Sequence, residues 1–231
     1  MSPRRSAQLD HLVVAARTLA EGVAWCEATL GVVPGPGGEH ALFGTHNRLL
    51  RLACEQAPRA YLEIIAIQPQ ATPTRPPGLK RWFDLDDPAL QAQLALHGPQ
   101  LVHWVASVPD IDAATQALRA LGLERGPVLT ASRPTPQGLL QWRIGVRDDG
   151  QRLLGGALPT LIQWGDTHPA DAMPPSGIAL RSLTLSHPEP NPLPQALTAI
   201  GLDTLAVVPG PAALTLQLDT PQGPLTLCSA I

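Results

Sequence analysis

Two six-residue stretches decide the fold of this chain: LDHLVV at residues 9–14 and LVHWVA at residues 101–106. Each has a histidine at its third position, and each is followed by a helix-like segment that ends in a Leu-Gly pair. Gly31 lies 20 residues after the first histidine, and Gly122 lies 19 residues after the second. An internal repeat of this kind indicates the architecture before any single motif does.

A third, degenerate copy of the repeat appears at LRSLTL, residues 180–185. Here Ser182 stands where His11 and His103 stand in the first two copies, and Gly201 follows 19 residues later. The chain is therefore predicted to contain three related units, of which only the first two keep the histidine.

The first unit predicts the element order β-α-β-β-β. Thr18 and Glu21 form a capping box at the start of a helix over residues 18–30, whose apolar residues recur on one face. Short apolar runs bounded by turn residues predict the strands. The strands predicted in the first unit are 41–43, 48–53 and 61–67. In the second unit, a helix capped by Asp110 precedes strands at 128–131, 139–146 and 160–164. In the third unit, a helix capped by Asn191 precedes strands at 214–218 and 225–228.

We therefore expect an α+β protein of two paired βαβββ modules with a third, degenerate βαβββ module. The boundaries follow the proline-rich connectors. They give a first module at 1–68, a linker with a short helix near residues 88–96 at 69–100, a second module at 101–167 and the third module at 168–231.

Composition limits the classes of partner. The formal net charge is −3 and no Lys/Arg cluster is present, which argues against nucleic acid and against an acidic membrane surface. No segment has the roughly 20 apolar residues that a membrane span needs, and the N-terminus has no apolar core of a signal peptide. The three cysteines are far apart, as expected of reduced thiols. A cytoplasmic protein with a small-molecule ligand is predicted.

The candidate chemistry lies on the first and last strands of each unit. Side chains alternate between the faces of a strand, so if Leu12 and Val14 pack under the helix, His11 faces the other side, and the same argument applies to His103. The last strands carry Glu63 and Gln163 within apolar runs. A carboxylate in such a place is costly unless it is paired or bound to a metal.

These residues resemble the vicinal oxygen chelate superfamily, the glyoxalase and extradiol dioxygenase fold, and most closely its glyoxalase-like domain proteins, over residues 8–165. In that family two βαβββ units enclose a cupped site, and the metal ligands come from the first and last strands of each unit. The resemblance implies His11, Glu63, His103 and Gln163 as metal ligands. It also implies that such paired units often form dimers.

Two imidazoles and a carboxylate suit a divalent ion of iron, manganese, nickel, zinc or cobalt and leave positions open for substrate oxygens. Relatives with isomerase or lyase activity generally have a glutamate where Gln163 stands, and an amide cannot accept a proton at neutral pH. Glu63 is then the candidate base. The resemblance predicts a metal-dependent isomerase, lyase or dioxygenase for a small substrate with adjacent oxygens. The alternative is a non-catalytic protein that binds or sequesters a small molecule in the same cup.

A second polar cluster lies next to the proposed site. His46, Asn47 and Arg48 are candidate substrate contacts, or form a solvated hairpin. Arg51 and Arg143 lie within strands, where they either face the cup as partners of an anion or lie across the sheet edge. The third unit has Ser182 and Thr226 or Cys228 at the ligand positions and is predicted to be structural.

Overall fold

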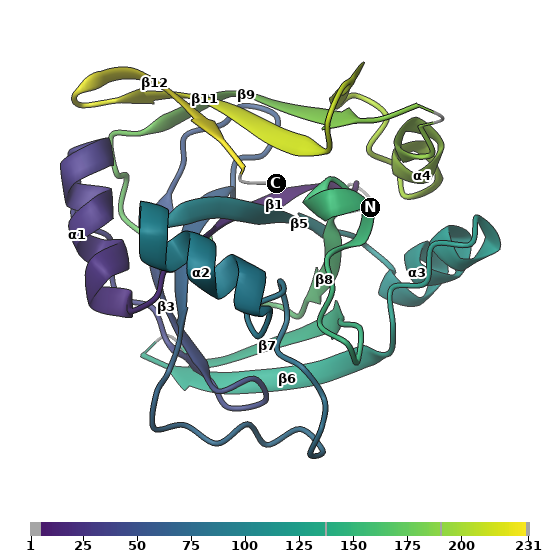
Figure 1. Ribbon diagram of the computed structural model, residues 1–231, viewed down its shortest axis with the longest axis horizontal. Coiled ribbons are helices and arrows are strands. Elements are labelled where there is room, and N and C mark those ends of the chain that lie inside the picture. Colours follow the sequence, from purple (N-terminus) through teal and green to yellow (C-terminus); the bar gives the residue numbers. More distant parts are fainter. Residues whose placement is uncertain (1–5, 137, 190, 230–231) are drawn as a thin grey trace.

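A computed structural model describes residues 6–136, 138–189 and 191–229. An eight-stranded sheet in the order β2-β3-β4-β1-β5-β8-β7-β6 curls around a cup, and a four-stranded sheet in the order β10-β9-β11-β12 forms a separate layer (Figure 1). The strands of the large sheet are β1 (Gln8–Ala15), β2 (Glu39–His40), β3 (Thr45–Arg51), β4 (Tyr61–Ile67), β5 (Gln100–Ser107), β6 (Val128–Thr135), β7 (Gly138–Gly145) and β8 (Thr160–Trp164). The small sheet holds β9 (Ala179–His187), β10 (Ala206–Pro209), β11 (Ala213–Thr220) and β12 (Gly223–Cys228).

The large sheet consists of two modules joined at its centre. Its helices are α1 (Leu19–Leu30) in the first module and α3 (Ile111–Ala120) in the second, and α2 (Pro88–His97) lies in the linker. In each module the first strand pairs in parallel with the last, β1 with β4 and β5 with β8, while β1 and β5 pair antiparallel with each other. This arrangement confirms the predicted α+β fold of paired βαβββ modules.

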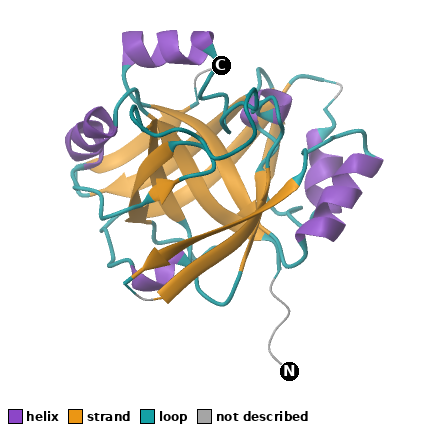
Figure 2. Cartoon of the chain, turned by 90° about the horizontal axis from the view of Figure 1, so that it is seen from below, coloured by secondary structure: helices purple, strands orange, loops and turns teal. Residues whose placement is uncertain are grey.

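Different elements pack against the two faces of the large sheet. Leu12, Val14 and Trp104 belong to the core between this sheet, the helices outside it and the small sheet. On the inner face, Val13 and Val105 pack with Leu90 and Leu94 of α2. Figure 1 shows α2 within the curve of the sheet, and Figure 2 shows other helices at its periphery. The linker thus fills part of the cup.

The third unit keeps the predicted element order but not the strand pairing of the first two. It runs β9, α4 (Leu193–Ala199), β10, β11 and β12. In its sheet β9 lies between β10, parallel, and β11, antiparallel, whereas β1 pairs with the last strand of its module. Leu183, Leu185 and Leu216 pack onto the main core, so the unit covers the outer face of the large sheet.

Most local predictions agree with the structure, and two strands, 61–67 and 160–164, agree to the residue. The strand predicted at 41–43 is wrong. Phe43 and Gly44 donate their backbone N–H groups to the carbonyl of His40 in a tight turn, and Gly44 has a positive φ of 58°. The strand ends at His40 because that turn reverses the chain into β3.

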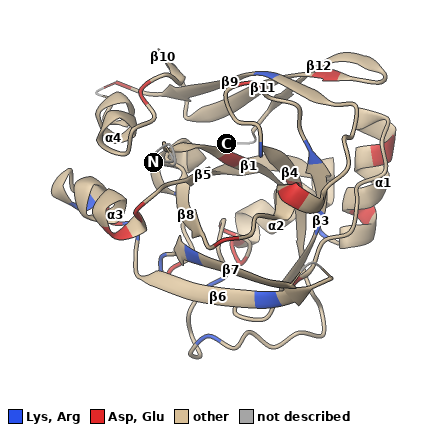
Figure 3. Ribbon diagram, turned by 180° about the vertical axis from the view of Figure 1, so that it is seen from behind, with Lys and Arg blue, Asp and Glu red and all other residues tan. Residues whose placement is uncertain are grey.

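Helix starts follow the predicted caps. Thr18 accepts a hydrogen bond from the backbone of Glu21, and Asp110 accepts from Asp112 and Ala113. The cap position of α4 is Pro192 rather than Asn191, although the Asn191 side chain still accepts from the N–H of Leu193. No helix within the described residues is long and apolar enough to span a membrane. Acidic and basic residues are interspersed over the ribbon in Figure 3.

Candidate active site

A bulge at the start of β1 brings two polar neighbours to the same place. In the pairing with β5, Leu9 lies opposite Ala106 and His11 opposite Val105, so Asp10 is an extra residue without a partner. Strict alternation would put Asp10 and His11 on opposite faces of the sheet. The bulge turns them toward each other, and Oδ1 of Asp10 lies 2.7 Å from Nδ1 of His11.

The Asp10 carboxylate is the anchor of a buried hydrogen-bond network. It is 1% exposed and accepts from Nδ1 of His11, from Nε1 of Trp164 (2.8 Å) and from Nε2 of His168 (3.2 Å). Burial alone would raise the pKa of Asp10, but the hydrogen bonds from His11 and His168 hold it well below its usual range. Because an ionised carboxylate only accepts hydrogen bonds, His11 donates from Nδ1 and turns Nε2 toward Glu63.

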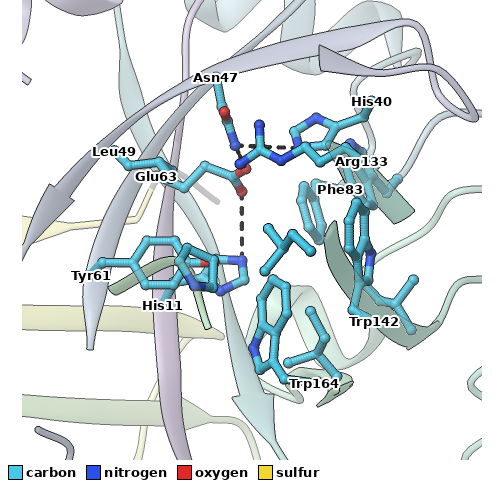
Figure 4. Close-up of a pocket in the computed structure, with 15 residues that line it drawn as sticks. His11, His40, Asn47, Leu49, Tyr61, Glu63, Phe83, Arg133, Trp142 and Trp164 are labelled. Carbon is cyan, nitrogen blue, oxygen red and sulfur yellow. Dashed lines mark hydrogen bonds and ion pairs between the residues drawn. The ribbon is translucent and has the colours of Figure 1, made fainter. Parts of the chain in front are cut away.

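Glu63 lies on β4, two residues after the strand partner of His11, Tyr61. Its Oε2 is 3.6 Å from Nε2 of His11, and its Oε1 accepts from Nδ2 of Asn47 at 2.6 Å (Figure 4). Asn47 is fixed in turn, since its Oδ1 accepts from the N–H of Gly38 (2.8 Å) and its Nδ2 lies 3.3 Å from Nε2 of His40. One oxygen of the buried carboxylate is thus held, while the other faces the histidine.

His40 supports this arrangement as a neutral imidazole. Burial, and then the charge of Arg133, lower the pKa of His40 to about 3. Its Nε2 is the acceptor for Asn47, so its proton lies on Nδ1, 3.1 Å from the hydroxyl of Thr45. His40 therefore positions Asn47 and does not supply a proton at neutral pH.

A cavity of about 30 Å³ adjoins His11 and Glu63, which is room for about two water molecules. Arg133 of β6 forms part of its wall, and the close approach of that guanidinium depends on Gly38, where a Cβ atom would collide with it. Among the described residues, neither Nε of Arg133 nor Nε1 of Trp82 has a hydrogen-bond partner. The rest of the wall is mostly apolar: Leu49, Phe83, Leu140, Trp142, Ile144, Ile162, Trp164 and Pro169.

His103 takes the equivalent position in the second module but has no free ring nitrogen. In the β1–β5 pairing His11 lies opposite Val105 and His103 opposite Val13. Nδ1 of His103 lies 3.1 Å from the carbonyl of Gly156, and Nε2 accepts from the N–H of Thr160 at 3.2 Å. The ring is fully buried, and burial, followed by the charge of Arg125, holds its pKa well below the usual value.

Gln163 lies on the other face of β8. Its Oε1 accepts from the N–H of Ile111 at 3.0 Å and so caps α3. Strand register gives the equivalent of Glu63 instead: Val13 pairs with Glu63, and Val105 pairs with Thr160. Thr160, not Gln163, occupies the second-module position that Glu63 occupies in the first.

These positions test whether the predicted ligands fit a metal ion. His11 and Glu63 come together, with their nearest ring nitrogen and carboxylate oxygen at 3.6 Å. His103 and Gln163 do not join them, because their acceptors are used by Thr160 and Ile111. In residues 6–136, 138–189 and 191–229 no group of three or more His, Cys, Asp or Glu side chains is placed to hold a metal. A catalytic zinc site keeps three protein ligands, so the donors present do not fit the expected centre.

The predicted substrate contacts do not lie together at the cavity either. Asn47 lines the cavity, whereas Arg48 is exposed and His46 is half-buried on alternate positions of β3. Arg51 donates to the carbonyls of Ala170 and Pro58, and Arg143 forms an exposed ion pair with Asp112. The sequence did not identify Asp10, Arg133 and His168 as site residues; only the position of Asp10 beside His11 in the repeat gave a usable signal.

The fold and this cluster define a protein of paired βαβββ modules with a cupped polar site. A family model described as a glyoxalase-like domain matches residues 9–201. This match covers most of the sequence, and the chain belongs to the glyoxalase-like domain family, within the vicinal oxygen chelate fold. No curated protein matches the sequence.

Solved structures are similar to this chain at low sequence identity. A hypothetical protein from Staphylococcus aureus is 13% identical with a TM-score of 0.56, and the alignment covers 97% of this chain and 85% of that one. Methylmalonyl-CoA epimerase from Streptomyces coelicolor, in a complex with 2-nitronate-propionyl-CoA, is 20% identical with a TM-score of 0.40, covering 69% and 94%. The epimerase from Mycobacterium tuberculosis is 17% identical with a TM-score of 0.39, covering 71% and 91%.

Proposed function

We propose that this protein is an isomerase or lyase that moves a proton at the carbon next to a carbonyl group of a small substrate. The observation that carries this proposal is the pair of a buried carboxylate and an imidazole, Glu63 and His11, beside a cavity. Buried titratable groups that converge on a cavity are typical of acid–base sites. Asp10 is a positioning residue, because it holds His11 through Nδ1 and does not line the cavity.

The proton-transfer step uses groups already in place. Glu63 accepts the proton from the substrate carbon through Oε2, since Oε1 is occupied by Asn47. The electrons of the broken C–H bond move onto the carbonyl oxygen and form an enolate. The unpartnered N–H groups of Arg133 and Trp82 are donors for that oxygen, and donors aimed at developing charge stabilise it strongly in a dry site.

The short distance between His11 and Glu63 favours proton transfer on one face of the substrate. His11 and Glu63 approach within 3.6 Å, so both act from the same side of the substrate. In an isomerase that acts on a 2-hydroxy carbonyl compound, Glu63 returns the proton on that side to the former carbonyl carbon, while the hydroxyl proton passes to the former carbonyl oxygen. In a lyase the enolate instead expels a leaving group, and the proton that Glu63 took from carbon passes through Nε2 of His11 to that group. Racemisation needs bases on opposite faces and is not favoured.

A metal ion is not assigned a step in this proposal. His11 and Glu63 are the two residues that would contact a divalent ion in the cup, but the third and fourth expected ligands, His103 and Gln163, are bonded elsewhere. Acid–base chemistry needs only the residues that converge. The proposal thus retains the expected isomerase or lyase class and Glu63 as the base.

Hydrogen–deuterium exchange tests the proposal without a known product. We would incubate the protein in D₂O with small 2-oxo acids, 2-hydroxy ketones and 2-hydroxy aldehydes and follow the C–H signal next to the carbonyl by proton NMR. The wild-type protein should exchange at least one of them, and E63Q should lower the rate by about 10²- to 10⁴-fold, the usual contribution of a general base. E39Q is the matched control, because Glu39 is an exposed carboxylate on β2.

The second candidate function is a small-molecule binding protein. The specific observation in its favour is the apolar wall, to which Trp82, Trp142 and Trp164 contribute. A binding protein would show saturable quenching of tryptophan fluorescence by a compound that undergoes no exchange. Exchange that is equal in wild type and E63Q would exclude Glu63 as the base.

A further inference from the structure

The second half of the cup contains a buried arginine whose charge has no carboxylate partner. Arg125 follows α3 and is 3% exposed. Its Nη2 donates to the hydroxyl of Thr160 at 2.6 Å, while Nε and Nη1 have no partner among the described residues. Guanidinium groups stay charged in proteins, and burial of a charge is costly unless it is paired. Two unsatisfied donors on such a group indicate a missing acceptor.

The neighbouring arginines are compensated, and Arg125 is not. Nε of Arg152 donates to Asp84 at 2.7 Å, and Nε of Arg147 donates to Asp149 at 2.9 Å. All three arginines line one small cavity, and no Asp or Glu is among its lining residues. The cavity is therefore electropositive, and the exposed Gln151 on its wall connects it to the surface.

Thr160 fixes the arginine through a directed chain of hydrogen bonds. The Thr160 hydroxyl accepts from Arg125 and lies 3.1 Å from Nε2 of His103. The N–H of Thr160 also donates to that nitrogen, so the ring proton of His103 lies on Nδ1, toward the carbonyl of Gly156. The guanidinium is thus held in place while two of its nitrogens, Nε and Nη1, have no partner among the described residues, as expected of a preorganised binding group.

We propose that Arg125 anchors an oxyanion-binding site in the second half of the cup, which takes the carboxylate or phosphate group of a small ligand. The cavity volume is about 10 Å³, which admits one water-sized group such as one oxygen of that anion. Trp82 and Phe83 line both this cavity and the one beside Glu63, so they separate the two sites. The proposal goes beyond the proposed function, because it requires binding and no turnover.

Thermal unfolding with simple anions tests the site. Wild-type protein would be unfolded in sodium phosphate, sodium acetate and sodium chloride at matched ionic strength. We expect a saturable rise in Tm with phosphate or acetate above that in chloride, and the anion that acts distinguishes a phosphate site from a carboxylate site. In R125M the anion affinity should fall about tenfold to a hundredfold, the range for lost hydrogen bonds to a charged group.

The control is R143M, which removes an arginine that is exposed and paired with Asp112. It should keep the rise in Tm. Without added anion, R125M should be at least as stable as wild type, because it replaces an unpaired buried charge by an apolar side chain of similar shape. No anion-specific rise in wild type, or an equal rise in R125M, would overturn the proposal.

A second measurement keeps the test open if R125M does not fold. The Nε–H signal of Arg125 in the ¹H–¹⁵N spectrum of wild-type protein can be assigned with R125K. It should shift and saturate on titration with the same anion that raises Tm. A signal that does not move at any anion concentration would also overturn the proposal.

Discussion

His11 and His103 occupy equivalent positions on β1 and β5, but the residues around them differ and leave different ring nitrogens available. In the first half of the cup, Asp10 holds Nδ1 of His11, and Nε2 faces Glu63. In the second half, the residue before the histidine is Val102, and Thr160 stands where Glu63 stands. The ring of His103 is then held by Thr160 and Gly156. The repeat therefore shows that the two histidines occupy equivalent positions in the fold. The neighbouring residues determine whether a ring nitrogen faces another acid–base group.

The largest expected effect separates the two histidines by activity. H11Q should lower the rate of the exchange reaction by about 10²-fold or more, because it removes one of the two converging acid–base groups. H103Q should change that rate less than about tenfold but lower the free energy of unfolding by about 1 to 3 kcal/mol, the cost of leaving buried partners unsatisfied. Rates and denaturant unfolding are measured on both variants. Equal losses of activity would break the comparison.

The next effect concerns the residues that precede the histidines. D10L should lower the free energy of unfolding by about 3 to 5 kcal/mol, because it removes the acceptor of His11, His168 and Trp164 in a buried network. V102A removes two buried methyl groups and should cost about 2 kcal/mol or less. Urea titrations of both variants measure the difference. If D10L were as stable as V102A, the Asp10 network would not be holding the site.

Acid should destabilise the fold through its neutral histidines. Burial is the largest cause that lowers the pKa of both His40 and His103, whereas in the unfolded chain each has a pKa near 6.5. Below about pH 6.5 the unfolded state therefore binds more protons. The free energy of unfolding should fall as pH decreases, and the slope approaches about 1.4 kcal/mol per pH unit for each histidine. For His40 this loss continues down to its folded pKa of about 3.

Urea unfolding from pH 7 to 5 checks this prediction. H40Q should reduce the dependence of the free energy of unfolding on pH by about 1.4 kcal/mol per pH unit, the contribution of one histidine. H97Q, at an exposed position on α2, should leave this dependence unchanged. A wild-type stability that is constant over this range would show that these rings do not stay neutral in the fold.

The smallest expected effect is that of metal removal. With two converging ligands instead of three or four, the protein should retain less than one equivalent of metal after dialysis against a chelator, and its Tm should not change. Elemental analysis after loading with iron(II), manganese, nickel and zinc measures this directly. One tightly held ion per chain would contradict the ligand assignment and would show that His11 and Glu63 are joined by further donors.

The sequence could predict the modules and half of the polar site. The repeat located His11 and His103, and alternation placed both on the face away from the helices. Glu63 was found as a carboxylate within an apolar run. Asp10 was not found, because a bulge breaks the alternation and only the pairing with β5 shows it. Gln163 was misaligned with Glu63 because the register of β8 against β5 is a tertiary property.

The arginines were harder to predict for a different reason. Arg133 reaches the cavity through the space left by Gly38, more than 90 positions earlier in the chain. Arg125 is buried and donates to the hydroxyl of Thr160, which lies 35 positions later in the chain. The hydrogen bonds that occupy His103 come from a segment more than 50 residues away. Such contacts depend on the closed cup and have no local pattern.

The most direct test of the difference between the two halves is the protonation of the two rings. Long-range ¹H–¹⁵N correlation spectra recorded from pH 5 to 8 report which nitrogen of each histidine carries the proton. We predict that His103 remains a neutral ring protonated on Nδ1 throughout, and that His11 keeps its Nδ1 proton at every pH. A charged His103, or a His11 protonated on Nε2 alone, would contradict the division of the cup into an acid–base half and an anion-binding half.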